Sequence, residues 1–218
     1  MKKDKYIVIF SVLFIIALYI VDQILQMSYF YKVMFKLCMI AISYLVGKNF
    51  FNMSFDFLRF KNIRSYKKGI MLSFLTFTII FVGFFIVNNF MDLNVLKSEF
   101  INKYKLTGYK FFIASFYLVI INSFLEEYFF RGFIFLNYEN KKTGNILSSI
   151  MFSIYHISNF QNWFDNKLFL IIPIISLVIA GMIFNYLVSI NDDIYNSYIP
   201  HMFADLSIVI IGYFIIIH

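Results

Sequence analysis

Long apolar segments set the strongest limit on what this sequence can fold into. Several of them approach the roughly 20 residues that a helix needs to cross a bilayer, and little polar sequence separates them. Only 14% of the 218 residues are charged, whereas soluble domains carry about 25%. The sequence therefore predicts an all-α, polytopic membrane protein with little room for a separate soluble module.

Seven segments are predicted to span the membrane as one helical bundle. They cover Tyr6–Leu25, Tyr31–Val46, Gly69–Phe90, Phe111–Leu136, Asn145–Ile157, Leu168–Ile190 and Tyr198–Ile217. The first is expected to stay uncleaved because no small-x-small cleavage site follows it. The second contains Lys36, whose side chain is expected to reach for the lipid headgroups. The fifth is short, so it either extends past Ile157 or stops partway through the membrane.

The basic residues cluster between the apolar segments. In a soluble protein the net charge of +7 would suggest nucleic acid, but here these residues are expected to set the topology and to contact anionic lipid. Placing the N-terminus in the cytoplasm puts more Lys and Arg in the inner loops than in the outer ones. The abundance of Lys, Asn, Ile, Phe and Tyr is typical of AT-rich bacterial genomes, which predicts a bacterial plasma membrane. The single cysteine, Cys38, is expected to be a small buried hydrophobe.

Three ionisable residues stand out within the fourth predicted span. Glu126, Glu127 and Arg131 lie in an otherwise apolar run, and charged residues in a span usually face the bundle interior and mark function. Glu127 and Arg131 are four residues apart, so on a helix they can form an ion pair. Glu126 points about 100° away from Glu127. It has no such partner on its own helix and is expected to find one on another.

Helix geometry predicts that partner to be His156. The fourth and fifth spans form a hairpin that turns at residues 137–144. At ~1.5 Å rise per residue, Glu126 and His156 both lie about 22 Å from the centre of the turn along regular helices. Antiparallel neighbours would therefore place this carboxylate beside this imidazole inside the membrane.

The seventh span adds His201 and Asp205, four residues apart on one helix face. Glu126, His156, His201 and Asp205 can then share one polar pocket. A buried carboxylate and an imidazole can deprotonate water, and further donors can stabilise an oxyanion, as in a hydrolase. The same four side chains are also the metal-ligand candidates, because two imidazoles with carboxylates can hold zinc. These residues alone do not choose between the two.

Other intramembrane proteolytic chemistries find no support in the sequence. It contains no H-E-x-x-H zinc helix and no G-x-S-x-G serine turn. Asp22 and Asp205 are the only candidates for a pair of aspartates on facing spans.

Three short motifs resemble those of one family. They are EEYFFR (126–131) for E-E-x-x-x-R, FSIYH (152–156) for F-x-x-x-H, and HMFAD (201–205) for H-x-x-x-N/D, and AGMIFNYL (180–187) looks like the glycine-bearing helix that precedes the third motif. Their order and spacing are similar to those of the CPBP family, also called Abi. The family comprises intramembrane CAAX prenyl endopeptidases and bacterial proteins linked to bacteriocin processing and self-immunity. The resemblance divides the chain into residues 1–110, with the first three spans, and a family-like helical core at 111–218, within one structural unit.

The resemblance implies roles for the matched residues. Glu126 and His156 would activate the attacking water, His201 and Asp205 would stabilise the oxyanion, and Glu127 and Arg131 would support the site. Many members have asparagine where this chain has Asp205, and an ionised aspartate cannot donate to an oxyanion. Asp205 would therefore have to be protonated, orient His201 or bind a metal.

The expected function is cleavage of membrane-bound or lipidated peptides, in maturation or self-immunity, with no cofactor required and zinc as the alternative. A second hypothesis is a non-catalytic membrane protein that binds a bacteriocin or its receptor and gives immunity. A third, a proton-coupled transporter, would use the buried acids as relays, but the chain shows no internal repeat and few Gly or Pro interruptions.

Overall fold

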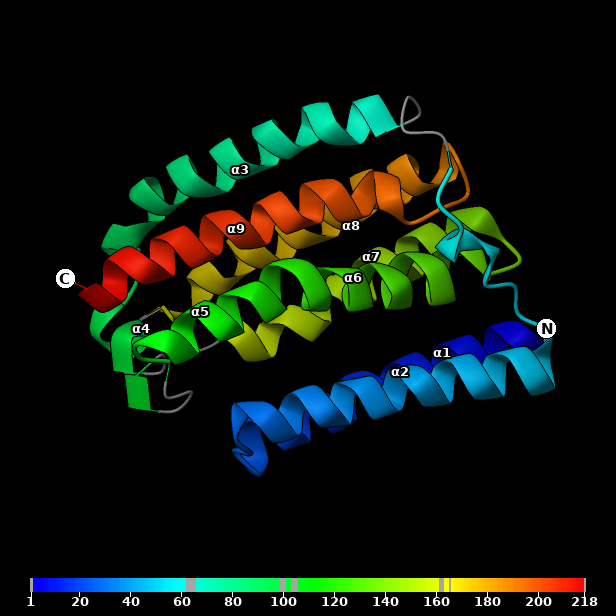
Figure 1. Cartoon of the computed structure of the whole chain (residues 1–218), viewed down its shortest axis with the longest axis horizontal. Coiled ribbons are helices and arrows are strands. Elements are labelled where there is room, and N and C mark those ends of the chain that lie inside the picture. Colours follow the sequence, from blue (N-terminus) through cyan, green and yellow to red (C-terminus); the bar gives the residue numbers. More distant parts are fainter. Residues whose placement is uncertain are drawn as a thin grey trace.

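The protein is an all-α bundle of long, roughly aligned helices (Figure 1). The computed structural model describes residues 2–61, 66–98, 101–102, 106–160, 163–164 and 166–217. Within these ranges the regular elements are all helical, and the only β pairing is one isolated bridge between Met91 and Phe164. The predicted fold class is therefore confirmed.

The first elements are α1 (Lys2–Tyr19), η1 (Ile20–Ile24), α2 (Tyr29–Phe51), η2 (Asp56–Leu58), α3 (Lys67–Val87), η4 (Asn88–Phe90) and α4 (Leu93–Ser98). There follow α5 (Tyr109–Phe116), η6 (Tyr117–Asn122), α6 (Ser123–Glu126), η7 (Glu127–Leu136), α7 (Lys141–Phe160), η8 (Lys167–Leu170), α8 (Ile171–Ser189) and α9 (Tyr195–Ile217).

Six helical segments of the described chain are long and apolar enough to cross a membrane. They are Lys2–Ile24, Tyr29–Phe51, Lys67–Ile86, Tyr109–Leu136, Lys167–Ser189 and Tyr195–Ile216. Each corresponds to one of the predicted spans, with ends that shift by a few residues. The protein is therefore a multi-pass integral membrane protein, as its composition predicted.

The remaining predicted span corresponds to α7, which is longer than predicted and more polar than the other long helices. It extends past both ends of the predicted segment, to 20 residues, or about 30 Å of helix. Its serines face neighbouring helices: the Ser148 hydroxyl donates to the Phe130 carbonyl at 2.7 Å, and Ser153 donates to the Ile174 carbonyl at 2.8 Å. A β-carbon on Gly181 would lie only 2.9 Å from Ser149 Cα, so this glycine lets α8 pack closely against α7.

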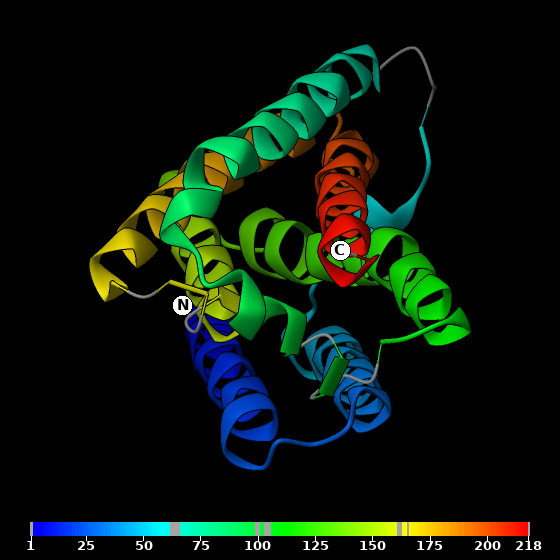
Figure 2. The ribbon, with the colours of Figure 1, turned by 90° about the vertical axis from the view of Figure 1, so that its left-hand side faces the viewer.

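The helices pack in layers around the C-terminal half of the fourth span, where η7 is buried, whereas α5 at its start is largely exposed. Helix α3 lies along α9, while α7 contacts both α8 and η7. Helices α1 and α2 lie side by side at one flank of the bundle (Figure 2). Helix α1 joins the core through Phe14, whose ring centroid is 4.3 Å from that of Phe129 on η7.

Helix α2 is the most lipid-exposed part of this flank, and only Ser43 and Gly47 are buried on it. Cys38 is exposed there, so the expectation of a buried cysteine is wrong. The reason is that α2 lies outside the core, where an apolar side chain meets lipid rather than protein.

The fourth span is one continuous helix, but it is not a regular α-helix. Its turns widen to the π type in η6 and again in η7, on either side of the short α6. The assumption of a regular helix at Glu126 and Glu127 is therefore wrong in detail. Widened turns are rare and occur frequently at functional sites.

The loop before α9 fixes where that helix begins. The Asp193 side chain is buried, accepts a hydrogen bond from the Tyr195 backbone N–H at 3.0 Å and accepts another from the Tyr66 hydroxyl at 3.1 Å. Burial raises the pKa of Asp193, against the opposing effect of the Tyr66 hydrogen bond. These contacts connect the start of α9 to the residues that precede α3.

Candidate active site

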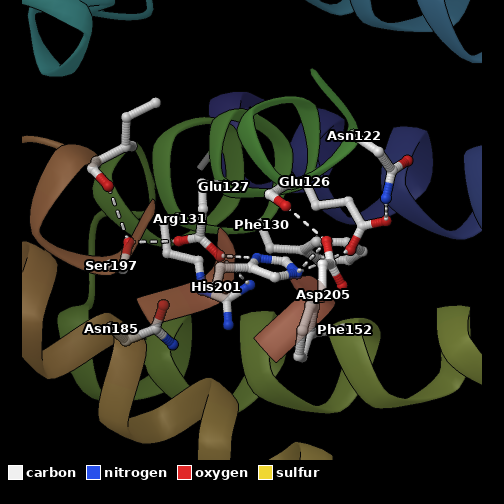
Figure 3. Close-up of polar contacts among 12 residues, drawn as sticks. Asn122, Glu126, Glu127, Phe130, Arg131, Phe152, Asn185, Ser197, His201 and Asp205 are labelled. Atoms are coloured by element: carbon white, nitrogen blue, oxygen red, sulfur yellow. Dashed lines mark hydrogen bonds and ion pairs between the residues drawn. The ribbon is translucent and has the colours of Figure 1, made fainter. Parts of the chain in front are cut away.

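The polar residues singled out in the sequence come from three helical segments and meet in one pocket. Glu126 ends α6 and Glu127 begins η7, His156 lies on α7, and His201 and Asp205 lie on α9. Figure 3 shows His201 between the two glutamates, with Asp205 beside Glu126. The expected neighbour of Glu126 is present, because its Oε2 lies 3.5 Å from His156 Nε2.

The two oxygens of the Glu126 carboxylate have different surroundings. Oε1 accepts hydrogen bonds from Asn122 Nδ2 at 2.7 Å and from the Tyr155 hydroxyl at 3.0 Å, and it lies 3.5 Å from Lys36 Nζ. Oε2 is buried and has no hydrogen-bond partner. It faces His156 Nε2 at 3.5 Å and His201 Nε2 at 3.6 Å. One oxygen is therefore fixed by donors, and the other is presented to the two imidazoles.

The hydrogen bond on the far side of His156 defines its tautomer. Its Nδ1 lies 2.8 Å from the Phe152 carbonyl oxygen, which can only accept, so Nδ1 carries a proton. In the neutral ring Nε2 is then an acceptor. Two acceptors, Nε2 and Glu126 Oε2, face each other, and a water molecule could donate one hydrogen to each.

His201 is held in the same way by a carboxylate. Its Nδ1 lies 2.8 Å from Glu127 Oε1, and Glu127 Oε2 accepts a hydrogen bond from the Ser197 hydroxyl. A carboxylate on Nδ1 stabilises the doubly protonated imidazolium, which is the form that can donate from Nε2. Glu127 therefore does more than pair with Arg131, the only contact that helix spacing predicted for it.

Asp205 lies beside His201 without orienting it. Its Oδ2 accepts a hydrogen bond from Ser123 Oγ at 2.5 Å and is 3.8 Å from His201 Nε2, which is too long for a hydrogen bond. Because Glu127 occupies Nδ1, the orienting role is already taken. Asp205 instead lies next to Nε2 without bonding to it.

Comparison with known proteins identifies the segment that carries this pocket. A family model described as Rce1-like, type II CAAX prenyl endopeptidase, matches residues 108–207. This segment, just under half of the chain, is similar to the Rce1-like family. The match contains all three motifs noted in the sequence, and it confirms the resemblance to CAAX proteases. No curated protein and no solved structure matches the chain.

Arg131 of the Rce1-like segment forms the expected ion pair with Glu127, at 3.3 Å between Nη1 and Oε1, with both side chains fully buried. None of its three nitrogens has a hydrogen-bond partner. Its guanidinium carbon lies 4.1 Å from the ring centroid of Phe152 and 5.1 Å from that of Phe184, which gives cation–π contacts instead. Glu127 is thus the nearby anion that neutralises this charge.

Several pocket residues were missed from the sequence. Asn122 donates to Glu126 from the same helix, four residues earlier, so the prediction that Glu126 lacks a partner on its own helix is wrong. Tyr155 is adjacent to His156 in the sequence, and Ser123 lies one helical turn before Glu127, so both could have been considered as pocket residues. Nothing in the sequence around Ser197 indicated that it would contact Glu127. Lys36 is a cation within a predicted span, which is a recognisable sign of a functional residue, but it was predicted to reach for the headgroups rather than for Glu126.

Zinc was the alternative to direct water activation, and two imidazoles with carboxylates are suitable ligands. Across the described part of the chain, however, no group of three or more His, Cys, Asp or Glu side chains is arranged so that it could hold a metal ion. One oxygen of Glu126 is turned toward Asn122, Tyr155 and Lys36 rather than toward the histidines. These side chains therefore do not fit a zinc site.

Proposed function

We propose that this protein is an intramembrane endopeptidase that hydrolyses a peptide bond in membrane-bound, lipid-modified peptides. The observation that carries the proposal is the unpartnered Oε2 of Glu126, which faces the Nε2 atoms of His156 and His201 in a buried pocket. The family description names prenyl endopeptidases, which favours a prenylated C-terminal peptide. It does not mention bacteriocins, so immunity is not part of the proposal.

The first step uses the two facing acceptors. A water molecule donates one hydrogen to Glu126 Oε2 and the other to His156 Nε2, which leaves its oxygen lone pair directed at the substrate. As the oxygen attacks the scissile carbonyl carbon, Glu126 takes the proton. General base catalysis of this kind contributes about 10²–10⁴-fold to a rate.

The second step needs a donor for the oxyanion. His201, held as an imidazolium by Glu127, donates from Nε2 to the carbonyl oxygen as it gains charge. The tetrahedral intermediate then collapses with cleavage of the C–N bond, and Glu126 returns its proton to the leaving nitrogen. The products are a new carboxylic acid and a free amine. Loss of one oxyanion donor typically lowers kcat by about 10²–10³-fold.

The test is hydrolysis of a farnesylated, fluorescently labelled CAAX-type peptide by the full chain in proteoliposomes. Mass spectrometry would detect release of the C-terminal fragment. Glu126→Gln should lower kcat by about 10²–10⁴-fold, whereas the matched control Glu139→Gln, at an exposed glutamate outside the pocket, should keep the wild-type rate. Full activity of Glu126→Gln would refute the glutamate-base mechanism. Cleavage of the unprenylated peptide at an equal rate would refute the lipid requirement.

A further inference from the structure

Lys36 is a cation within a candidate span, and it points into the bundle. It lies on α2, outside the family match, and its side chain is only 12% exposed. Charged side chains at membrane depth are costly unless they are paired. The other lysines of α2 have partners near its ends: Lys32 pairs with Asp22, and Lys48 donates to Tyr44 at 3.1 Å. Lys36 instead reaches the catalytic glutamate.

Three acceptors surround the Lys36 ammonium. It donates to Asn122 Oδ1 and to the Tyr155 hydroxyl oxygen, and it lies 3.5 Å from Glu126 Oε1. An ammonium has three N–H donors, so each has an acceptor within reach. The same three residues also contact one another, because Asn122 and Tyr155 both donate to Glu126 Oε1.

These contacts fix the direction of the hydrogen bonds that reach Glu126. With its carbonyl oxygen occupied by Lys36, the Asn122 amide is oriented so that Nδ2 donates to Oε1. The Tyr155 hydroxyl oxygen accepts a hydrogen bond from Lys36, so its single hydrogen is left to donate to Glu126 Oε1. One cation therefore directs both neutral donors, and its own charge, toward the same carboxylate oxygen.

The surroundings strengthen this arrangement. Apolar residues line the space next to Lys36 and Glu126, among them Phe14, Ile40 and Phe129, and the gap between them has no room for a water molecule. Charges in such a dry environment interact strongly because little solvent screens them. A purely structural anchor for α2 would not need a charge here, since α2 is already held by the Lys32–Asp22 ion pair near its start and by apolar contacts with the core.

We propose that Lys36 is a positioning residue for the reaction and that the N-terminal α1–α2 hairpin thereby completes the active site. Lys36 acts through Asn122, Tyr155 and Glu126 Oε1, which leaves Oε2 as the oxygen that faces the histidines. This inference rests on the proposed function, because it assigns a purpose to the orientation of Glu126. It also means that the Rce1-like segment alone lacks one part of the site.

The test compares Lys36→Met with Lys48→Met, which removes a lysine from the same helix away from the pocket. In the proteoliposome assay Lys36→Met should lower kcat by about 10–100-fold, the range expected when a reacting group is misplaced by about 1 Å. KM should change by less than threefold, roughly, because Lys36 does not touch substrate. Lys48→Met should match the wild type in both parameters.

A chemical rescue separates positioning from folding. Lys36→Cys in a Cys38→Ser background has a single thiol, since Cys38 is the only natural cysteine. Alkylation with 2-bromoethylamine forms a sulfur–carbon bond with loss of bromide and rebuilds an ammonium of almost the same reach. This product should recover most of the kcat, whereas alkylation with iodoacetamide should not. Equal recovery by the uncharged group would overturn the proposal.

The remaining outcomes distinguish this inference from the proposed function. Wild-type activity in Lys36→Met, together with an inactive Glu126→Gln, would overturn the role of Lys36 alone. Absence of hydrolysis by the wild type, or full activity in Glu126→Gln, would instead overturn the proposed function. Should Lys36→Met not fold, Lys36→Gln provides the neutral variant, and a wild-type kcat in it would equally overturn the inference.

Discussion

Replacing Glu127 by glutamine tests how strongly the buried ion pair supports the site. Glu127 and Arg131 are both fully buried and lie 3.3 Å apart, and the guanidinium nitrogens have no hydrogen-bond partner. In Glu127→Gln the Arg131 charge stays in place without an anion beside it. A glutamine oxygen can still accept a hydrogen bond from His201 Nδ1, so the main effect is that the positive charge of Arg131 is no longer compensated.

The magnitude follows from that geometry. Removal of one partner from a buried ion pair costs about 3–5 kcal/mol, because an uncompensated charge remains. The aromatic faces of Phe152 and Phe184 offset only part of this, at about 2 kcal/mol for a desolvated cation–π contact. We therefore expect Glu127→Gln to lower the free energy of unfolding by about 1–3 kcal/mol. The double variant Glu127→Gln/Arg131→Met should regain about half of that loss, since no unpaired charge is left.

The assay is reversible unfolding of the purified protein in mixed micelles, followed by circular dichroism. The wild type, both single variants and the double variant form a double-mutant cycle that isolates the coupling between the two residues. Activity gives a second reading: Glu127→Gln should lower kcat even in the fraction that stays folded, because a neutral amide stabilises the His201 imidazolium less than a carboxylate does. A stability loss below about 1 kcal/mol, or a coupling near zero, would refute the reasoning.

Three further outcomes follow from the pocket and the topology. Asp205→Asn should retain activity within about tenfold in the peptide hydrolysis assay, because an amide can still accept from Ser123 and can also donate to an oxyanion. Loss of activity in this variant would show that the carboxylate itself is required. Activity should survive prolonged dialysis against a metal chelator, because water activation is assigned to Glu126 and His156; loss of activity that added zinc restores would show otherwise. The turn before α7 should face the cytoplasm with the N-terminus, since the Glu139 backbone N–H donates to Asp4 at 3.1 Å. A Cys38→Ser/Glu139→Cys variant should then resist an impermeant thiol reagent in intact cells and react in inverted vesicles.

The placement of Glu126 next to His156 could be predicted because it depends on local geometry. A hairpin places residues at equal chain distance from its turn at equal depth, and this holds although η7 has widened turns. The pairing of Glu127 with Arg131 was equally local. Both predictions used only the spacing along helices that are adjacent in sequence.

The contacts of Lys36 and Glu127 with distant helices could not be predicted in this way. Lys36 is separated from Glu126 by 90 positions and Glu127 from His201 by 74, and no short turn relates their depths. Apolar composition places α2 in the membrane but does not say which of its faces meets the core. The interpretation of Lys36 as a residue that reaches for headgroups was wrong because its side chain turns inward, where Asn122, Tyr155 and Glu126 offer acceptors.

The count of charges in the pocket gives a reason why Asp205 is not equivalent to asparagine. The pocket contains three carboxylates, on Glu126, Glu127 and Asp205. It also contains two cationic side chains, Lys36 and Arg131. A low-dielectric environment favours a neutral total, so one additional proton is needed, either on His201 or on a carboxylate. Asparagine at this position would remove both the third carboxylate and that requirement. In the proposed mechanism, Asp205 would therefore help to keep His201 in the doubly protonated form, in which Nε2 can donate to the oxyanion, without itself being a donor. Asp205→Asn would then lose the stabilisation of doubly protonated His201 but gain an amide that can donate to the oxyanion directly. These two effects oppose each other, so the expected change in rate is modest.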